Sequence, residues 1–128
     1  VIFSHQKSRL SQDFVYIDAG TTTLALVQAL SGPALEAHYV TNGIAHARLL
    51  AQKGCKVFVP GGMLRPNTEA IVGAAAVASL QAYNFTKAFL GANGVDLQAG
   101  FTTPDPRLVR QKLAVRQGGT AVNLIELS

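Results

Sequence analysis

The chain has 128 residues and a mass of 13.5 kDa, which favours a single domain. Hydrophobic residues make up 48% of it and charged residues only 14%, against about 25% in a typical soluble domain. This apolar content excludes a disordered tail, yet every apolar run is far shorter than the roughly 20 residues of a transmembrane helix. The formal net charge is +4, but no basic run is interleaved with aromatic residues, so charge alone does not indicate a nucleic-acid binder. The single cysteine, Cys55, and the polar residues scattered through Val1–Leu10 favour a soluble, cytoplasmic protein.

Short apolar strands alternate with longer helix-like segments, a pattern typical of an α/β domain. In chain order, strands are predicted at 14–17, 37–40, 56–59, 85–90 and 121–127. Helices are predicted at 21–30, 44–52, 73–83 and 108–116. Met63–Ile71 contains Arg65-Pro66-Asn67 and is expected to form a hairpin or an excursion over the sheet. The sequence therefore predicts a mostly parallel sheet with helices on both faces.

The segment Asp18-Ala-Gly-Thr-Thr-Thr23 lies between the first predicted strand and the first predicted helix. Ligands of open parallel sheets bind at the carboxyl ends of the strands. Gly20 would let the backbone approach a ligand, and Thr21, Thr22 and Thr23 would offer hydroxyl donors beside the positive end of a helix. A simpler alternative is that Asp18 or one threonine caps the helix, but three consecutive threonines exceed what a cap requires. The segment predicts a phosphate site, and it is not a Walker loop because the Gly-Lys-Ser/Thr ending is missing.

Three further predicted strands end in polar or glycine-rich segments that would meet at the same edge of the sheet. The residues concerned are Thr41 and Asn42, then Gly61 and Gly62, then Gly91, Asn93 and Asp96. Each segment alone is an ordinary turn. Together they are more suggestive of a ligand crevice, in which Asn42 and Asp96 would bind sugar hydroxyls.

Several short motifs occur in one order along the chain. They are Asp18-Ala-Gly-Thr-Thr-Thr23, Val40-Thr-Asn42, Val59-Pro-Gly-Gly62, Leu64-Arg-Pro66, Val72-Gly73, Lys87-Ala-Phe-Leu-Gly-Ala92 with Gly94, and Gly100-Phe-Thr-Thr103. In this order the chain resembles the C-terminal effector-sensing domain of the DeoR family of sugar-metabolism repressors, over about Val15–Lys112. The resemblance implies a fold similar to ribose phosphate isomerase and the CoA transferases. It also implies binding of a phosphorylated sugar or related metabolite, with Lys112 adding positive charge.

The chain departs from the family pattern at both ends. No segment before Phe14 has room for the family's winged helix, so operator DNA is expected as a partner only through a domain outside this chain. Arg107 and Leu108 replace the acidic residues common before Lys112, and the chain ends at Ser128 where the family has a further polar segment. We therefore expect residues 1–128 to form one sensing domain with a trimmed or altered C-terminal end.

Other candidate residues give weaker signals. The histidines and the cysteine lack close metal-ligand spacing and are interpreted as surface or core residues: His5, His38, His46 and Cys55. Lys87 is expected to be solvated, and Arg65 to reach an anion or to stay in water. No metal and no cofactor is predicted.

The leading hypothesis is a metabolite sensor that binds a sugar phosphate without turnover and shifts a repressor homo-oligomer between two arrangements, with no membrane partner. In it, the threonine loop holds phosphate and Asp18, Asn42 and Asp96 bind hydroxyls. The alternative is a sugar-phosphate isomerase of the same fold, which needs a positioned carboxylate base. The paired acidic motif of ribose phosphate isomerases is not apparent after the fourth strand. A pure oligomerisation module would leave the threonine cluster unexplained.

Overall fold

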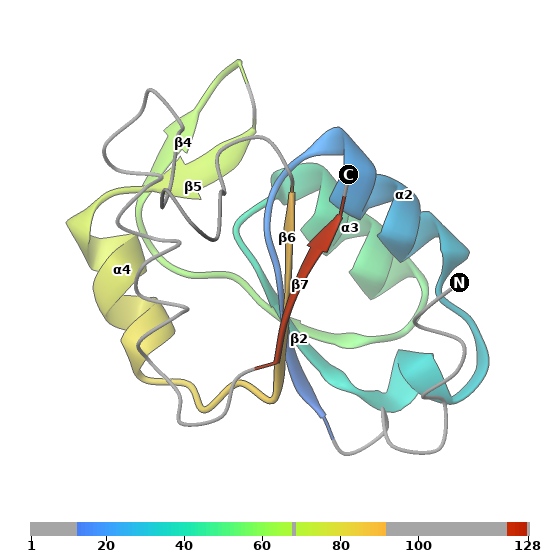
Figure 1. Ribbon diagram of the computed structural model, residues 1–128. Coiled ribbons are helices and arrows are strands. Elements are labelled where there is room, and N and C mark those ends of the chain that lie inside the picture. Colours follow the sequence, from blue (N-terminus) through green and yellow to red (C-terminus); the bar gives the residue numbers. More distant parts are fainter. Residues whose placement is uncertain (1–12, 68, 92–122, 128) are drawn as a thin grey trace.

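The computed structural model describes residues 13–67, 69–91 and 123–127, and its centre is a five-stranded parallel sheet (Figure 1). The strands, in the spatial order β3-β2-β1-β6-β7, are Lys56–Phe58, His38–Thr41, Phe14–Ile17, Lys87–Gly91 and Asn123–Leu127. Strand β1 pairs on both sides, so that Tyr16 lies opposite Val40 of β2 and Ala88 of β6. Residues 15–17 of β1 are buried without alternation, as expected for a parallel strand covered on both faces.

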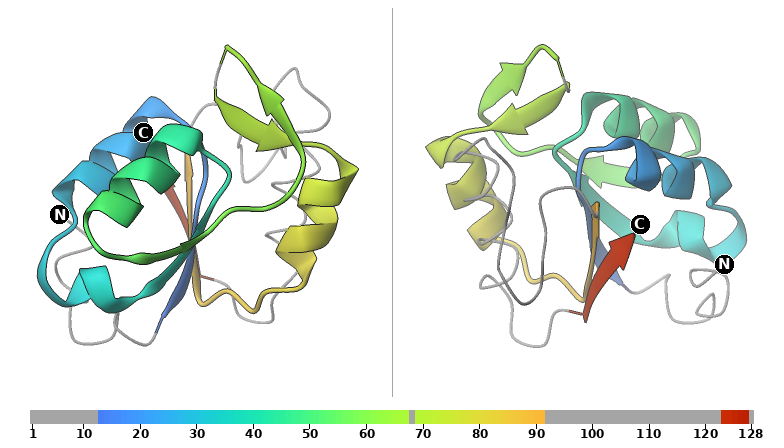
Figure 2. Two further views of the ribbon diagram at one scale, coloured as in Figure 1. Left: turned by 180° about the vertical axis from the view of Figure 1, so that it is seen from behind. Right: turned by 45° about the horizontal axis from the view of Figure 1, so that its top comes forward.

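Helices cover both faces of this sheet, as the sequence predicts. They are α2 (Thr21–Ala29), the short 3-10 helix η2 (Gly32–Glu36), α3 (Ile44–Gln52) and α4 (Ala74–Gln81). Helices α2 and α3 lie on one face and α4 lies on the other (Figures 1 and 2). None of the helices in the described ranges is long and apolar enough to cross a membrane.

Alternate residues of the strands pack into two separate cores, one under each helical layer. The core under α2 and α3 contains Val15, Ile17, Val27, Leu50 and Phe89, among others. The core under α4 contains Tyr16, Val40, Leu80, Ala88 and Leu90, among others. The two cores hold the strands between the helical layers, so the carboxyl ends of the strands lie at one edge of the sheet.

The excursion after β3 is an antiparallel hairpin of β4 (Met63–Arg65) and β5 (Ala70–Val72). It is attached to the end of β2 and the start of α3. The Ile71 N–H donates to the Asn42 carbonyl at 2.8 Å, and Gly43 forms an antiparallel bridge with Ala70. The hairpin therefore lies at the carboxyl edge of the sheet, beside the end of β2.

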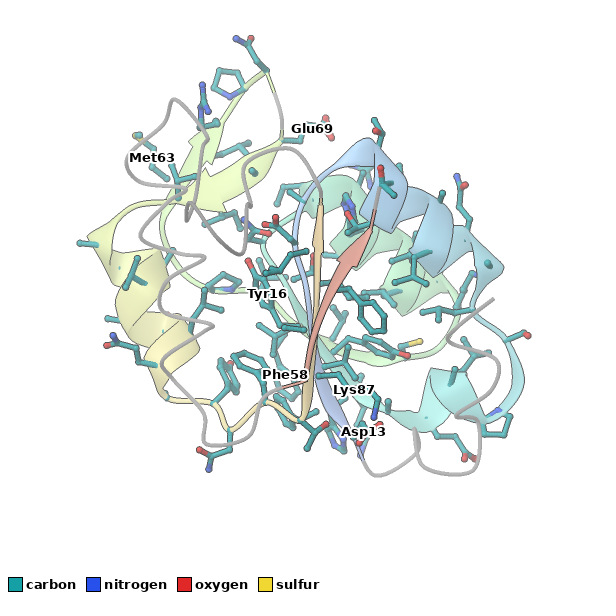
Figure 3. The ribbon with its side chains drawn as sticks, in the orientation of Figure 1. Asp13, Tyr16, Phe58, Met63, Glu69 and Lys87 are labelled. Atoms are coloured by element: carbon teal, nitrogen blue, oxygen red, sulfur yellow. The ribbon has the colours of Figure 1, made fainter. Side chains whose placement is uncertain are left out.

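Two expectations from the sequence need correction. Lys87 is buried, not solvated: its Nζ lies 2.8 Å from Oδ2 of Asp13, whose Oδ1 accepts a hydrogen bond from the Thr86 hydroxyl at 3.0 Å (Figure 3). Strand β6 lies inside the sheet between β1 and β7, so it has no open edge, and Lys87 is buried there. The second correction is η2, which lies between α2 and β2 where the sequence predicts no helix and has a proline in its first turn. The predicted helix 108–116 lies outside the described residues.

Candidate ligand-binding site

A pocket of about 340 Å³ opens at the carboxyl ends of β1 and β2. Three segments form its walls: the loop from β1 into α2, the first turn of α3, and the turn between β4 and β5. The described lining residues are Ala19, Gly20, Thr21, Leu24, Ala45, His46, Asn67, Glu69 and Ala70. The volume is within the range of small-molecule sites, and its position is where open parallel sheets bind ligands.

The loop after β1 is held by strands on both sides. The Asp18 N–H donates to the Phe89 carbonyl of β6 at 2.9 Å, and the Ala19 N–H donates to the Asn42 Oδ1 at 2.8 Å. Gly20 follows with a φ of +151°, a backbone conformation that residues with a side chain rarely adopt. The loop thus presents its backbone to the pocket in a fixed position.

Helix α2 begins directly at this loop. Its N-cap residue is Gly20, which has no side chain, so neither Asp18 nor a threonine occupies the N-cap position. The buried Thr23 hydroxyl donates to the Asp18 carbonyl at 2.6 Å. Thr21 is exposed and lines the pocket, while Thr22 is half-buried behind it. The positive end of the α2 dipole, with its glycine N-cap, therefore faces the pocket.

His46, in the first turn of α3, connects the two helices at the base of the pocket. Its Nε2 lies 2.9 Å from the Gly20 carbonyl oxygen and 3.0 Å from the Thr23 Oγ1. Because the carbonyl can only accept, Nε2 carries the proton and donates. The side chain is 4% exposed, and this burial lowers the pKa of His46, a shift that the bond to Gly20 opposes.

Gly43 makes room for this imidazole. A Cβ built at position 43 would lie 2.9 Å from the His46 Cγ, closer than packed side chains allow. The Gly43 N–H donates to the Thr41 Oγ1 at 3.2 Å, which ends β2 and turns the chain into α3. A glycine at position 43 is thus required by the position of the His46 side chain.

The third wall is the turn of the hairpin, which ends at Glu69. The Ile44 N–H donates to the Glu69 carbonyl at 2.9 Å, so the start of α3 holds this residue in place. Glu69 has a φ of +51°, and it is the only residue other than glycine with a positive φ in the described ranges. In Figure 3 its side chain lies between the hairpin and the start of α2.

The structure places the ligand-binding residues predicted from the sequence at different distances from the pocket. Gly20 and Thr21 line the pocket, whereas Asp18, Thr23, Thr41 and Asn42 form the buried layer behind it. The Asn42 Nδ2 is buried and has no hydrogen-bond partner among the described residues. Gly61 and Gly62 are not among the described lining residues, and a Cβ at Gly62 would meet the Val72 carbonyl at 2.7 Å. Gly91 ends β6, and Asn93, Asp96 and Lys112 lie outside the described residues. Ligand contacts by all of these residues stay predictions.

Sequence reasoning missed His46 and Glu69. The lack of a metal partner near His46 in the sequence predicts a surface or core residue, and the structure buries it in the core without assigning it a ligand role. Within the described ranges, no three His, Cys, Asp or Glu side chains gather as a metal site. The available signal was its position in the first turn of a helix that begins directly after a strand, three residues after a glycine. Glu69 gave no comparable signal, because the hairpin that carries it to the pocket is a tertiary arrangement.

Cys55 is buried, and burial raises the pKa of its thiol.

Comparison with known proteins identifies the family to which the chain belongs. The model of the DeoR C terminal sensor domain matches residues 10–125. The HTH-type transcriptional regulator FruR of Bacillus subtilis (strain 168) is 41% identical over 118 residues, 91% of this chain and 46% of that protein. The regulator GlpR of Haloferax volcanii is 36% identical over 117 residues (89% and 45%), and IolR of Bacillus subtilis is 33% identical over 105 residues (80% and 41%). The chain spans about half the length of these relatives, and it belongs to the DeoR C-terminal sensor domain family.

Proposed function

We propose that the chain is the effector-binding domain of a transcriptional repressor of sugar metabolism, and that its pocket binds a phosphorylated sugar. The observation that carries this proposal is the start of α2, which has a glycine as its N-cap residue and lines the pocket. Backbone N–H groups at a helix start, together with the helix dipole, bind phosphate without a basic side chain. Gly20 keeps this approach open, and the exposed Thr21 hydroxyl is a further donor.

The sugar end of the ligand would extend from the helix start toward α3 and the hairpin. Asn42 is suited to this end because its Nδ2 is a buried donor without a partner among the described residues. Asp18, Asp96 and Lys112 are proposed from the sequence to complete the site, the first two through sugar hydroxyls and Lys112 through the phosphate charge. Hydroxyl and amide contacts of this kind fix orientation in small-molecule sites.

The chain would act by binding, not by catalysis. Ligand binding would favour one of two arrangements of a cytoplasmic homo-oligomer and so change its hold on operator DNA, which a part of the protein outside this chain would contact. The relatives carry the name HTH-type transcriptional regulator, which supports a protein with one part that binds the ligand and another that contacts DNA. We propose residues 1–128 as one sensor domain within such a protein.

Calorimetric titration and thermal unfolding with matched sugars, each phosphorylated and unphosphorylated, test the proposal. A sugar phosphate at 100 times its Kd should add about 2.7 kcal/mol to the free energy of unfolding, and its unphosphorylated partner should add much less. Thr21→Ala should weaken the phosphorylated form, while Ser31→Ala, an exposed position outside the pocket, serves as the matched control. Equal binding of both forms, or binding of neither, would contradict the proposal. Conversion of ribose phosphate to ribulose phosphate by the chain would favour an isomerase instead.

A further inference from the structure

His46 is the one side chain among the described lining residues that can carry a positive charge, since the other ionisable side chain there is the acidic Glu69. Its ring lies beside the proposed phosphate position, because Nε2 is 2.9 Å from the carbonyl oxygen of Gly20, the N-cap residue of α2. We propose that His46 takes up a proton from solvent when a phosphate binds, and so supplies the positive charge of the site. This inference rests on the proposed function.

The imidazole is neutral in the free chain near neutral pH. The side chain is 4% exposed, and this burial lowers the pKa of His46. Nε2 carries a proton and donates it to Gly20, whereas Nδ1 is buried and has no hydrogen-bond partner among the described residues. A proton added to Nδ1 in the free chain would therefore gain no hydrogen bond, and the charged ring would lack hydration. The ring thus has one nitrogen open to a proton and no reason to hold it until a ligand arrives.

A bound phosphate reverses this balance. Phosphate at the start of α2 would accept hydrogen bonds from the N–H groups that follow Gly20, and the imidazole contacts the carbonyl of that same residue. A doubly charged anion and a positive ring this close attract each other strongly in a partly buried pocket. The bond from Nε2 to Gly20 also becomes stronger when the ring is charged. Phosphate and proton therefore bind together, and each raises the affinity for the other.

The protein's own charged groups around the imidazole are present in the free and the bound chain alike. Helix α2 has no charged residue, and on α3 the exposed Arg48 lies two positions further along, which places it on a different side of the helix. Strand β1 is followed by the buried Asp18, and the hairpin contributes Glu69 and Arg65. The two carboxylates favour a charged ring and the two arginines oppose it, before and after binding. The added charge on binding is that of the phosphate, which therefore sets when the proton is taken up.

Proton uptake can be measured directly. Calorimetric titration with hexose and pentose monophosphates, repeated in buffers of different ionisation enthalpy, gives the number of protons bound with each ligand. At about pH 7 the parent chain should take up about half a proton or more. The sign is diagnostic, because a phosphate monoester with a second pKa of about 6 releases protons when its dianion is bound. His46→Gln should take up none, since glutamine keeps an N–H donor but cannot gain a charge.

Two control variants separate His46 from other titrating groups. Glu69→Gln removes the pocket carboxylate, which could also gain a proton beside a phosphate. His38→Gln removes a half-buried histidine at the start of β2, outside the described lining of the pocket. Both controls should keep the uptake of the parent. The ratio of parent to His46→Gln affinity should also rise as the pH falls from about 8, by at most about tenfold for each pH unit, the limit for one linked proton.

Each outcome decides the inference. Uptake that is lost in His46→Gln and kept in both controls supports it. If His46→Gln does not fold, nitrogen NMR of the histidine rings in the parent shows whether His46 becomes charged on binding. A parent that binds a monophosphate with no proton uptake overturns the role of His46 and leaves the sensor proposal intact. Uptake that persists in His46→Gln, or disappears in Glu69→Gln, also overturns it. A parent that binds no phosphorylated sugar overturns both proposals, and that result precedes any variant.

Discussion

The imidazole of His46 holds the carbonyl of Gly20 at 2.9 Å and thereby connects the first turn of α3 to the loop that opens α2. The same Nε2 lies 3.0 Å from the Thr23 hydroxyl, which donates to Asp18. One buried side chain thus fixes both the glycine at the mouth of the pocket and the threonine behind it. The geometry of the pocket depends on a residue that gains a charge when it takes up a proton in acid.

This dependence predicts how stability varies with pH. Burial lowers the pKa of His46 in the folded chain below its ordinary value of 6.5, so below that pH the unfolded chain binds more protons at this position. The contribution of His46 to stability is therefore complete above about pH 6.5 and decreases as the pH falls toward the lowered pKa. Urea unfolding between pH 5 and pH 8, run beside His46→Gln, measures it. Parallel pH curves for the parent and the variant would contradict the prediction.

The threonines of the loop should separate into structural and ligand-binding roles. Thr23→Val keeps the side-chain shape but removes a buried hydroxyl, so the free energy of unfolding should fall by about 1–3 kcal/mol. Thr21→Ala should leave stability nearly unchanged and weaken a phosphorylated ligand about 10- to 100-fold, the value of a hydrogen bond to a charged group. Melting curves and calorimetric titration of both variants check this. A Thr21→Ala chain that binds as tightly as the parent would place the phosphate elsewhere.

A pair of glycines tests the packing around His46. Gly43→Ala should destabilise the fold by about 1–3 kcal/mol and loosen the pocket, because the new methyl group overlaps the imidazole. Gly61→Ala is the control, since a Cβ there meets no atom within 4 Å. Thermal unfolding of the two variants compares them directly. Equal melting temperatures would mean that His46 can move aside at little cost.

Sequence patterns predict most of this fold because each central strand is a short, mainly apolar run. The segments 14–17 and 44–52 match β1 and α3 as observed, since β-branched and aromatic runs, glycines and prolines mark local structure. The candidate site was predicted only in part. The Asp18–Thr23 loop was identified from local chemistry, but Glu69 reaches the pocket through a hairpin whose docking on α3 no local pattern encodes.

Lys87 shows the same limit in the core. Strand alternation predicts that Lys87 is solvated. No local sequence pattern reveals that β6 lies inside the sheet or that Asp13, 74 residues earlier, pairs with Lys87. Charged side chains at buried positions are predictable only once their partners are known.

The Lys87–Asp13 pair gives a further prediction. Lys87→Met should cost about 3–5 kcal/mol of stability, because it leaves the Asp13 carboxylate buried without its countercharge. Asp13→Asn combined with Lys87→Met should cost less than Lys87→Met alone, since neither charge then remains buried. Urea denaturation of the parent, the single and the double variant forms the test. A double variant less stable than the single one would show that the pair acts through something other than its charges.

The position of β1 in the middle of the sheet has a consequence for the order in which the protein can fold. Every described lining residue of the pocket lies between Ala19 and Ala70, but the strand that holds Asp18 from its other side, β6, begins only at Lys87. A chain still being synthesised therefore contains those residues before it can fix the loop that presents them. Closing a contact across some seventy residues makes the last step slow, and until then the edge of β1 is open to other strands. Binding competence should appear late in folding, together with the pairing of β1 and β6.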